Sequence, residues 1–127
     1  MFTHMQVTPP SLEKLAATPV LVAEMPPGFT HTKIVRLGPD RKLSTLGGVR
    51  IDFSNAHSTQ SESYALMKTN AAALLFARTE AKIDGGGLFH VRAVAVGRFV
   101  VGATVKTVSD ATNLLRLALA HFRRAEA

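Results

Sequence analysis

The chain contains no cysteine, no tryptophan and only one tyrosine. The missing cysteines exclude disulfide bonds, thiol nucleophiles and thiolate zinc sites, although they leave the cellular compartment open. The longest uninterrupted apolar segment is residues 71–77, far shorter than the roughly 20 residues that cross a bilayer. The amino terminus has no basic stretch followed by an apolar block, so no signal peptide is visible and we expect a soluble chain.

The composition is that of a globular protein with a core of its own. Of the 127 residues, 46% are hydrophobic and 19% are charged, which argues against intrinsic disorder. This length fits one domain. We expect a lead-in segment over residues 1–18, in which Ser11 caps a short helical turn, followed by a single domain over residues 19–127.

Three strands are predicted in the first half of the chain. The first is a short apolar segment, residues 20–23, which ends at a pair of prolines that cannot donate to a sheet. Residues 29–37 form the second. Residues 49–53 form the third, because apolar and charged residues alternate there with the period of a half-buried strand. On that pattern Arg50 and Asp52 should face water.

Two helices are predicted from capping signals. The segment Thr59-Gln60-Ser61-Glu62 has the capping-box form, with a hydroxyl at the cap and a carboxylate three residues later. It predicts a helix over residues 59–81, and the alanines at its centre indicate close packing on a sheet. A second box, Thr107-Val108-Ser109-Asp110, opens the last helix, where apolar residues recur at helical spacing.

Residues 88–106 are the part of the chain richest in strand-forming side chains, and they predict a hairpin around Gly97-Arg98. A glycine at the first central position suits a tight type II′ turn. On this register Val96 opposes Phe99 and Val94 opposes Val101, all on one face. The other face carries small residues, where a helix can approach closely.

The predicted order is therefore β-β-β-α-β-β-α, in which turns rather than helices connect most of the strands. This order favours the α+β class, with a mainly antiparallel sheet of about five strands. We expect the two principal helices to pack on one face of that sheet.

The segment IDGGGLFH, residues 83–90, contains three consecutive glycines. Phosphate-binding glycine loops follow a strand and open a helix, so that the helix amino terminus meets the anion. Here the predicted order is reversed, because a helix precedes the glycines and a strand follows them. We therefore interpret Gly85 to Gly87 as the end of the helix and a reversal of the chain.

No catalytic or metal-binding constellation is visible. None of the five histidines has the spacing of a helical metal motif, and the nine acidic residues are scattered. His31 and His90 both fall on predicted strands, and the sequence leaves open whether they meet in space. We predict no metal and no cofactor, and no catalytic residue can be assigned.

The net charge of +6 is concentrated in the second half of the chain. Residues 1–63 carry six basic and five acidic residues, whereas residues 64–127 carry nine and four. Such an excess attracts phosphate groups without requiring any sequence motif. The candidate anion-binding residues are Arg92, Arg98, Lys106, Arg116, Arg123 and Arg124.

Both faces of the predicted hairpin are apolar, while only two substantial helices are available to cover them. Either residues 1–24 pack across the remaining surface, or it takes a second copy of the chain, a protein partner or an apolar ligand. We expect a non-enzymatic binding or interaction module that can self-associate. One alternative is a binder of nucleic acid or anionic surfaces through the basic second half. The other is a small enzyme whose site is not visible in the sequence.

Overall fold

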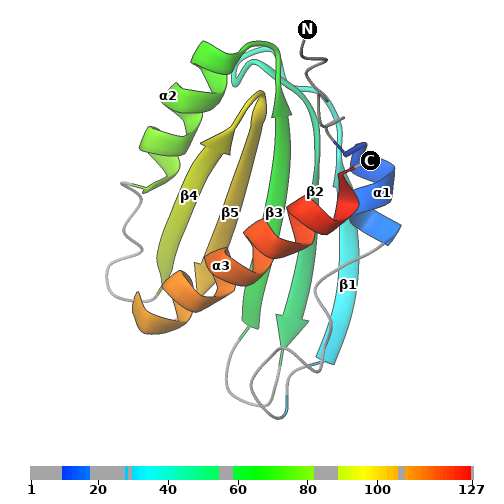
Figure 1. Ribbon diagram of the computed structural model, residues 1–127, viewed down its shortest axis with the longest axis vertical. Coiled ribbons are helices and arrows are strands. Elements are labelled where there is room, and N and C mark those ends of the chain that lie inside the picture. Colours follow the sequence, from blue (N-terminus) through cyan, green and yellow to red (C-terminus); the bar gives the residue numbers. More distant parts are fainter. Residues whose placement is uncertain are drawn as a thin grey trace, which may run out of the picture.

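A computed structural model of the chain describes residues 10–17, 28, 30–54, 59–81, 89–105 and 108–126. These residues form one antiparallel sheet of five strands, in the order β1-β2-β3-β5-β4, on which three helices pack (Figure 1). The predicted α+β class and the antiparallel sheet are confirmed. From β1 onward the elements follow the order β-β-β-α-β-β-α, but the third strand, residues 59–67, replaces the predicted strand over residues 20–23, which lies outside the described residues. The elements are α1 (Leu12–Ala17), β1 (Thr30–Leu37), β2 (Thr45–Ser54), β3 (Thr59–Met67), α2 (Asn70–Ala81), β4 (His90–Val96), β5 (Phe99–Val105) and α3 (Val108–Ala125).

The helices are divided between the two faces of the sheet, which corrects the prediction that both principal helices share one face. Neighbouring residues of a strand point to opposite faces. Val101 belongs to a large core cluster with residues of α1 and α3, whereas Val100 belongs to a smaller cluster with Ala73 and Ala77 of α2. Both faces of the β4–β5 hairpin are apolar, so each face needs its own cover.

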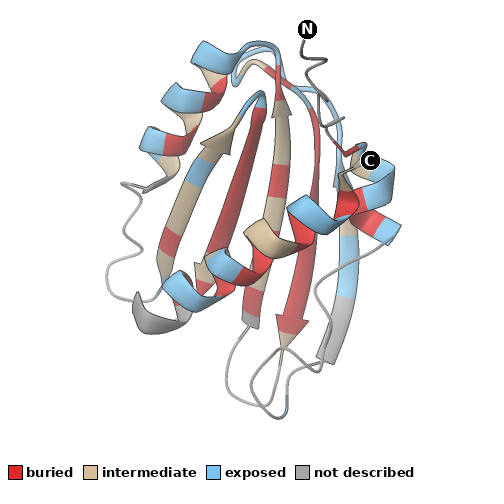
Figure 2. Cartoon of the chain, viewed as in Figure 1, coloured by how far each residue is buried: buried red, intermediate tan, exposed pale blue. Residues whose placement is uncertain are grey.

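The larger core lies between the sheet and α3, which runs diagonally across the front of the strands in Figure 1. The inner side of α3 and the strands beneath it are buried (Figure 2). Its centre is aromatic, because Phe122 of α3 contacts Phe99 edge-on at 5.2 Å between ring centroids and stacks with Tyr64 at 6.5 Å. The apolar positions predicted for this helix are confirmed as its inward side.

The β4–β5 hairpin has the predicted register. Val96 pairs with Phe99, and Val94 pairs with Val101. The turn residue Gly97 has a φ of 60°, a conformation that glycine adopts without steric cost. The hairpin therefore orients its larger side chains toward α3 and its small ones toward α2.

The predicted helix over residues 59–81 is wrong in its first half. Residues 59–67 form β3, the central strand, and α2 begins only at Asn70. Its capping residue is Thr69, whose Oγ1 accepts a hydrogen bond from the backbone N–H of Ala72 at 3.0 Å. The alternation in β3 was hidden because its inward side chains include Glu62, a residue type that is rarely buried.

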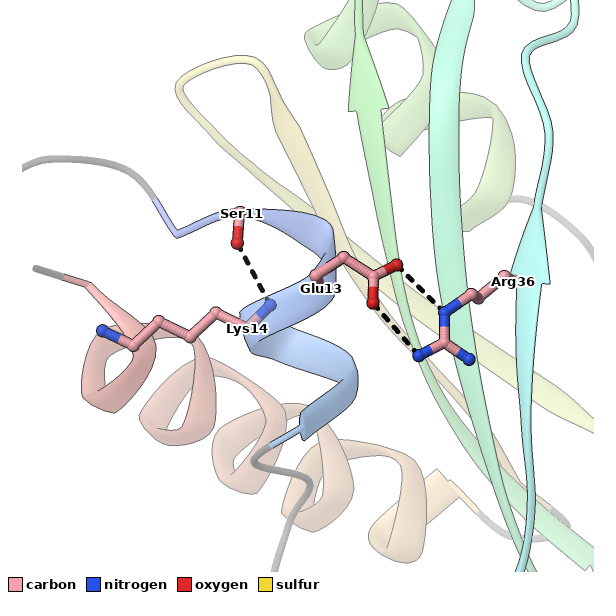
Figure 3. Close-up of polar contacts among 4 residues, drawn as sticks. All are labelled: Ser11, Glu13, Lys14 and Arg36. Carbon is pink, nitrogen blue, oxygen red and sulfur yellow. Dashed lines mark hydrogen bonds and ion pairs between the residues drawn. The ribbon is translucent and has the colours of Figure 1, made fainter.

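The short helix α1 is attached to both the core and the edge of the sheet. Ser11 Oγ accepts a hydrogen bond from the backbone N–H of Lys14 at 3.1 Å, as its predicted capping role requires. Glu13 receives two hydrogen bonds from the Arg36 guanidinium of β1, at 3.0 and 3.1 Å (Figure 3). These bonds hold the pKa of Glu13 below its ordinary value. Leu15, on the inward side of α1, is fully buried in the larger core.

Three predictions fall outside the described residues. They are the strand over residues 20–23, the turn at Gly85 to Gly87 and the cap at Thr107. The elements around the glycines nevertheless have the predicted order, because α2 ends at Ala81 and β4 begins at His90.

Candidate functional site

The helix α2 is placed on the sheet by small side chains and turns larger ones outward. Ala73 and Ala77 are buried against the sheet. On the other side of the helix, Leu74 and Leu75 keep 53% and 67% of their surface exposed. We call these two leucines, together with the exposed neighbours Ala71 and Arg78, the α2 outer face. It offers apolar surface to solvent without contributing to either core.

A groove runs between α2 and the sheet. Three adjoining cavities, of about 380, 300 and 240 Å³, are all lined by Phe76 of α2. We call their union the Phe76 groove. Its remaining apolar walls come from the end of β1, the β1–β2 turn and β3, through Leu37, Leu43 and Ala65. Small-molecule sites usually have volumes of about 300–1,000 Å³. The three cavities together fall within this range.

The β1–β2 turn is fixed in a conformation that brings Leu43 to the groove. Asp40 and Thr45 exchange backbone hydrogen bonds of 3.1 and 3.0 Å across the turn. Ser44 has a positive φ of 57°, and its carbonyl accepts a bond of 3.0 Å from the backbone N–H of Lys68. The turn is thereby tied to the connection that enters α2. Leu43 and Leu75 consequently line the same cavity.

The floor of the groove contains two hydroxyl groups among small residues. Ser63 of β3 and Thr104 of β5 line the 300 Å³ cavity, together with Gly102. A Cβ atom on Gly102 would lie 2.7 Å from Ser63 Oγ, so the glycine leaves room for that hydroxyl. The floor therefore combines close access with hydrogen-bonding capacity.

Arg50, one of the two basic residues that line the groove, is already neutralised. Arg50 lines the 300 Å³ cavity, and its Nε donates to Asp52 Oδ1 at 3.0 Å. Ser61 Oγ donates to the same oxygen at 2.7 Å. Asp52 is only 8% exposed, so the prediction that it faces water is wrong. Its bonds to the two neighbouring side chains explain how a carboxylate is buried there.

The acidic residue of the groove has no such compensation. Glu80 is half-buried near the end of α2 and lines two of the three cavities. Burial raises the pKa of its carboxyl group above the ordinary value. Within the described part of the chain, no hydrogen bond or ion pair reaches this carboxylate. The groove thus contains one uncompensated negative group.

A second hollow, of about 510 Å³, lies at the other end of the hairpin. It is lined by the β4–β5 turn, the start of α2 and the end of α3. Arg98 stands in this hollow, but its Nε donates to the carbonyl of Met67 at 3.1 Å. Its guanidinium therefore has a structural role, since it ties the hairpin turn to the end of β3.

The sequence interpretation missed a polar cluster inside the larger core. The Tyr64 hydroxyl lies 2.7 Å from Glu62 Oε2 and 2.7 Å from His121 Nδ1, and all three side chains are at most 1% exposed. Burial, and then the charge of Glu62, raise the pKa of Tyr64 far above its ordinary value. The hydrogen bonds of the cluster join β3 to α3 inside the core. Because its three side chains are shielded from solvent, the cluster is not part of a surface site.

A signal for this cluster does exist in the sequence. His121 stands three residues after Ala118 and seven after Leu114, which are both predicted on the apolar stripe of the last helix. This spacing places the histidine on the buried side. Glu62 and Tyr64 are two positions apart in the sequence, the spacing that places strand side chains on the same face. The signal was missed because residues 59–67 were assigned to a helix.

The structure describes five of the six predicted anion-binding residues and places them on β4, the β4–β5 turn and α3; Lys106 lies outside the described residues. Arg116 and Arg123 line one shallow hollow of about 340 Å³ on α3. Arg92 Nη1 instead donates to a backbone carbonyl at 3.1 Å. The charge of Arg124 reaches toward Tyr64, whose pKa it lowers slightly against the larger opposing effects.

The two histidines whose proximity the sequence left open are far apart. His31 pairs with Phe53 along β1, and His90 pairs with Val105 along β4. These strands are the opposite edges of the sheet, about 19 Å apart at roughly 4.8 Å per strand spacing. Among the residues the structure describes, no group of three histidine, aspartate or glutamate side chains is arranged to hold a metal ion.

Comparison with known proteins gives no relative: no protein-family model, no curated protein and no solved structure matches the chain. In the described ranges, none of the helices is both long and apolar enough to cross a membrane.

Proposed function

We propose that this protein is a non-enzymatic interaction module that associates with a second copy of itself through the α2 outer face. The observation that carries the proposal is the exposure of Leu74 and Leu75, 53% and 67%, on a helix that packs on the sheet through Ala73 and Ala77 of its opposite side. A single exposed leucine is ordinary. Two in succession, with Leu43 at 52% exposure across a shared cavity, make a contiguous apolar surface.

A second copy is the occupant that this surface suits best. A helix with an apolar strip can pack against its own image about a twofold axis, which makes the same patch serve both partners. Such antiparallel pairing would bring the leucines of the two copies together and leave Arg78 at the solvent-facing border. The small side chain of Ala71 permits close approach of the two helices.

Sedimentation velocity tests the proposal directly. The wild-type chain should sediment as a species of twice 13.6 kDa at about 100 μM, a concentration at which even a weak dimer is populated. Leu75→Ser should shift the distribution to the monomer. Ile34→Thr is the matched control, because Ile34 is an exposed apolar residue on β1, remote from α2. A monomeric wild type, or equal effects of both substitutions, would contradict the proposal.

The alternative, binding of nucleic acid or another anionic surface, is supported by one specific observation. Arg116 and Arg123 are seven residues apart, close to two helical turns, and face solvent from the same side of α3. If they bind phosphates, Arg116→Gln combined with Arg123→Gln should abolish retention on heparin at low salt. Retention should also fall steeply as salt rises. Absence of retention by the wild type would remove this alternative.

A further inference from the structure

The uncompensated carboxylate of Glu80 sets the Phe76 groove apart from the rest of the surface. The chain as a whole carries a net charge of +6. A half-buried acidic side chain in such a molecule would ordinarily acquire a basic partner, since burial disfavours its charged form. Glu80 projects instead into a groove walled by Phe76 and Leu37.

None of the described basic residues near the groove forms an ion pair with Glu80. Arg50, from β2, is bound to Asp52. Lys42, from the β1–β2 turn, lines the 240 Å³ cavity together with Glu80, but no ion pair joins the two side chains. Arg78, on α2 itself, belongs to the outer face. In the described residues, therefore, the positive charge that Glu80 would pair with is not supplied by the chain.

The surroundings of Glu80 specify what could supply that charge. Phe76 and Val91 offer apolar contact, and an aromatic face also attracts a cation. Ser63 and Thr104 provide hydroxyl oxygens that accept hydrogen bonds from N–H groups. An ammonium group donates three such bonds and accepts none, which matches one carboxylate and two hydroxyls.

We propose that the Phe76 groove is a binding site for a small organic amine, in which a protonated amino group pairs with Glu80 and an apolar stem lies against Phe76. The 300 Å³ cavity has room for a ligand of this kind. The 300 Å³ cavity is not lined by Leu74 or Leu75, although Leu75 lines the adjoining 240 Å³ cavity. The amine test therefore uses the 300 Å³ cavity and does not depend on the association of two copies of the chain. Binding and protonation of Glu80 oppose each other, because both neutralise the same carboxylate.

Three matched probes test the proposal: 4-phenylbutylamine, 4-phenylbutan-1-ol and 4-phenylbutyrate. They share one apolar stem and differ in the charge of the terminal group. Titrations followed by NMR at neutral pH should show that the amine binds about threefold to tenfold more tightly than the alcohol, as expected for one partly exposed ion pair. The carboxylate should bind most weakly. The preference for the amine should disappear under acidic conditions, in which Glu80 is protonated.

Two substitutions separate the carboxylate from the apolar wall. Glu80→Gln should bring the affinity of the amine down to that of the alcohol, whereas Phe76→Ala should weaken both probes. Glu126→Gln, which alters an acidic residue in the other hollow, should change neither affinity. Circular dichroism checks that each variant is folded, and Glu80→Asp provides a second, smaller change if Glu80→Gln is not. Equal affinity of the wild type for amine and alcohol, or saturable binding of none of the probes, would overturn the proposal.

Discussion

The Tyr64 hydroxyl lies 2.7 Å from His121 Nδ1, and this contact connects the central strand to the last helix inside the core. The same hydroxyl donates to Glu62 Oε2 at 2.7 Å. Buried polar groups are stable only when they are paired. We therefore expect the packing of α3 on the sheet to depend on this cluster.

Removing the Tyr64 hydroxyl should lower the free energy of unfolding. Tyr64→Phe keeps the ring contacts with Phe122 and removes the hydroxyl that bonds Glu62, His121 and the carbonyl of Ala118. Because these partners remain buried, we expect a loss of about 1–3 kcal/mol in the free energy of unfolding. Urea denaturation measures it. A variant as stable as the wild type would show that the cluster is not required.

The pKa of Tyr64 also predicts how stability responds to alkali. Burial raises the pKa of the phenol in the folded state, so the folded state holds this proton more tightly than the unfolded state does. Its contribution to stability should be complete below about pH 10, the ordinary range of tyrosine, and should decrease as the pH rises beyond it. Thermal melts between neutral and alkaline pH would show the decrease, and Tyr64→Phe should show less of it.

Glu80 should weaken the fold at neutral pH. Its pKa is raised by burial, so its favourable contribution is present when the carboxyl is protonated and is lost as the pH rises through the folded-state pKa. Glu80→Gln should accordingly increase stability at pH 7, by less than about 0.5 kcal/mol after allowance for solvent screening. The difference should vanish under acidic conditions. A decrease in stability on substitution would mean that the carboxylate has a partner.

The start of α2 can be located by substitution. Thr69→Ala removes the oxygen that accepts from the Ala72 N–H and should cost about 1 kcal/mol, whereas Thr69→Ser keeps that oxygen and should cost much less. Denaturant titration of both variants measures the difference. Equal stability of the two would place the cap at another residue.

The hairpin turn tests the backbone requirement at Gly97. Its φ is 60°, and an added Cβ would meet no atom within 4 Å, so the penalty is conformational and not steric crowding by neighbours. Gly97→Val should cost about 1–2 kcal/mol, and Gly97→Asn should cost less because asparagine tolerates this region. Comparison of their melting temperatures separates the two. Similar melting temperatures would argue against a positive φ at this position.

The parts of the fold that could be predicted from sequence are those where the chemical character of a side chain matches its burial. The hairpin register followed from Gly97 and from the alternation of valines around it. The strand β3 could not be found in this way, because Glu62 and Tyr64 face inward. Their burial depends on His121, which is 57 residues further along the chain and whose proximity to Tyr64 only the tertiary structure reveals.

The candidate binding groove was beyond sequence reasoning for a related reason. The groove exists because α2 packs on the opposite face of the sheet from α3. The sequence predicted both helices on one face, an arrangement in which this groove does not form. Phe76 lies within the helix predicted over residues 59–81, and its place beside the β1–β2 turn depends on how the shorter α2 packs on the sheet. The lack of compensation at Glu80 depends on where Arg50 and Lys42 lie in space, which their positions in the chain do not state.

The pairing of β3 with β5 is the only strand pairing of the described sheet that joins strands not adjacent along the chain order. Every other strand pair joins neighbours in the chain, so residues 10–81 and residues 89–126 each form a locally paired half. In the sheet the two halves meet along six residue pairs, from Ser61 with Thr104 to Leu66 with Phe99, and outside it α2 packs on the β4–β5 hairpin and α3 on the strands of the first half. The Glu62–Tyr64–His121 cluster spans the same boundary. Two separately produced fragments, residues 10–81 and 89–126, would thus each carry one side of the β3–β5 pairing and part of the buried cluster. Glu62 and Tyr64 on one fragment and His121 on the other would fix a single register between β3 and β5.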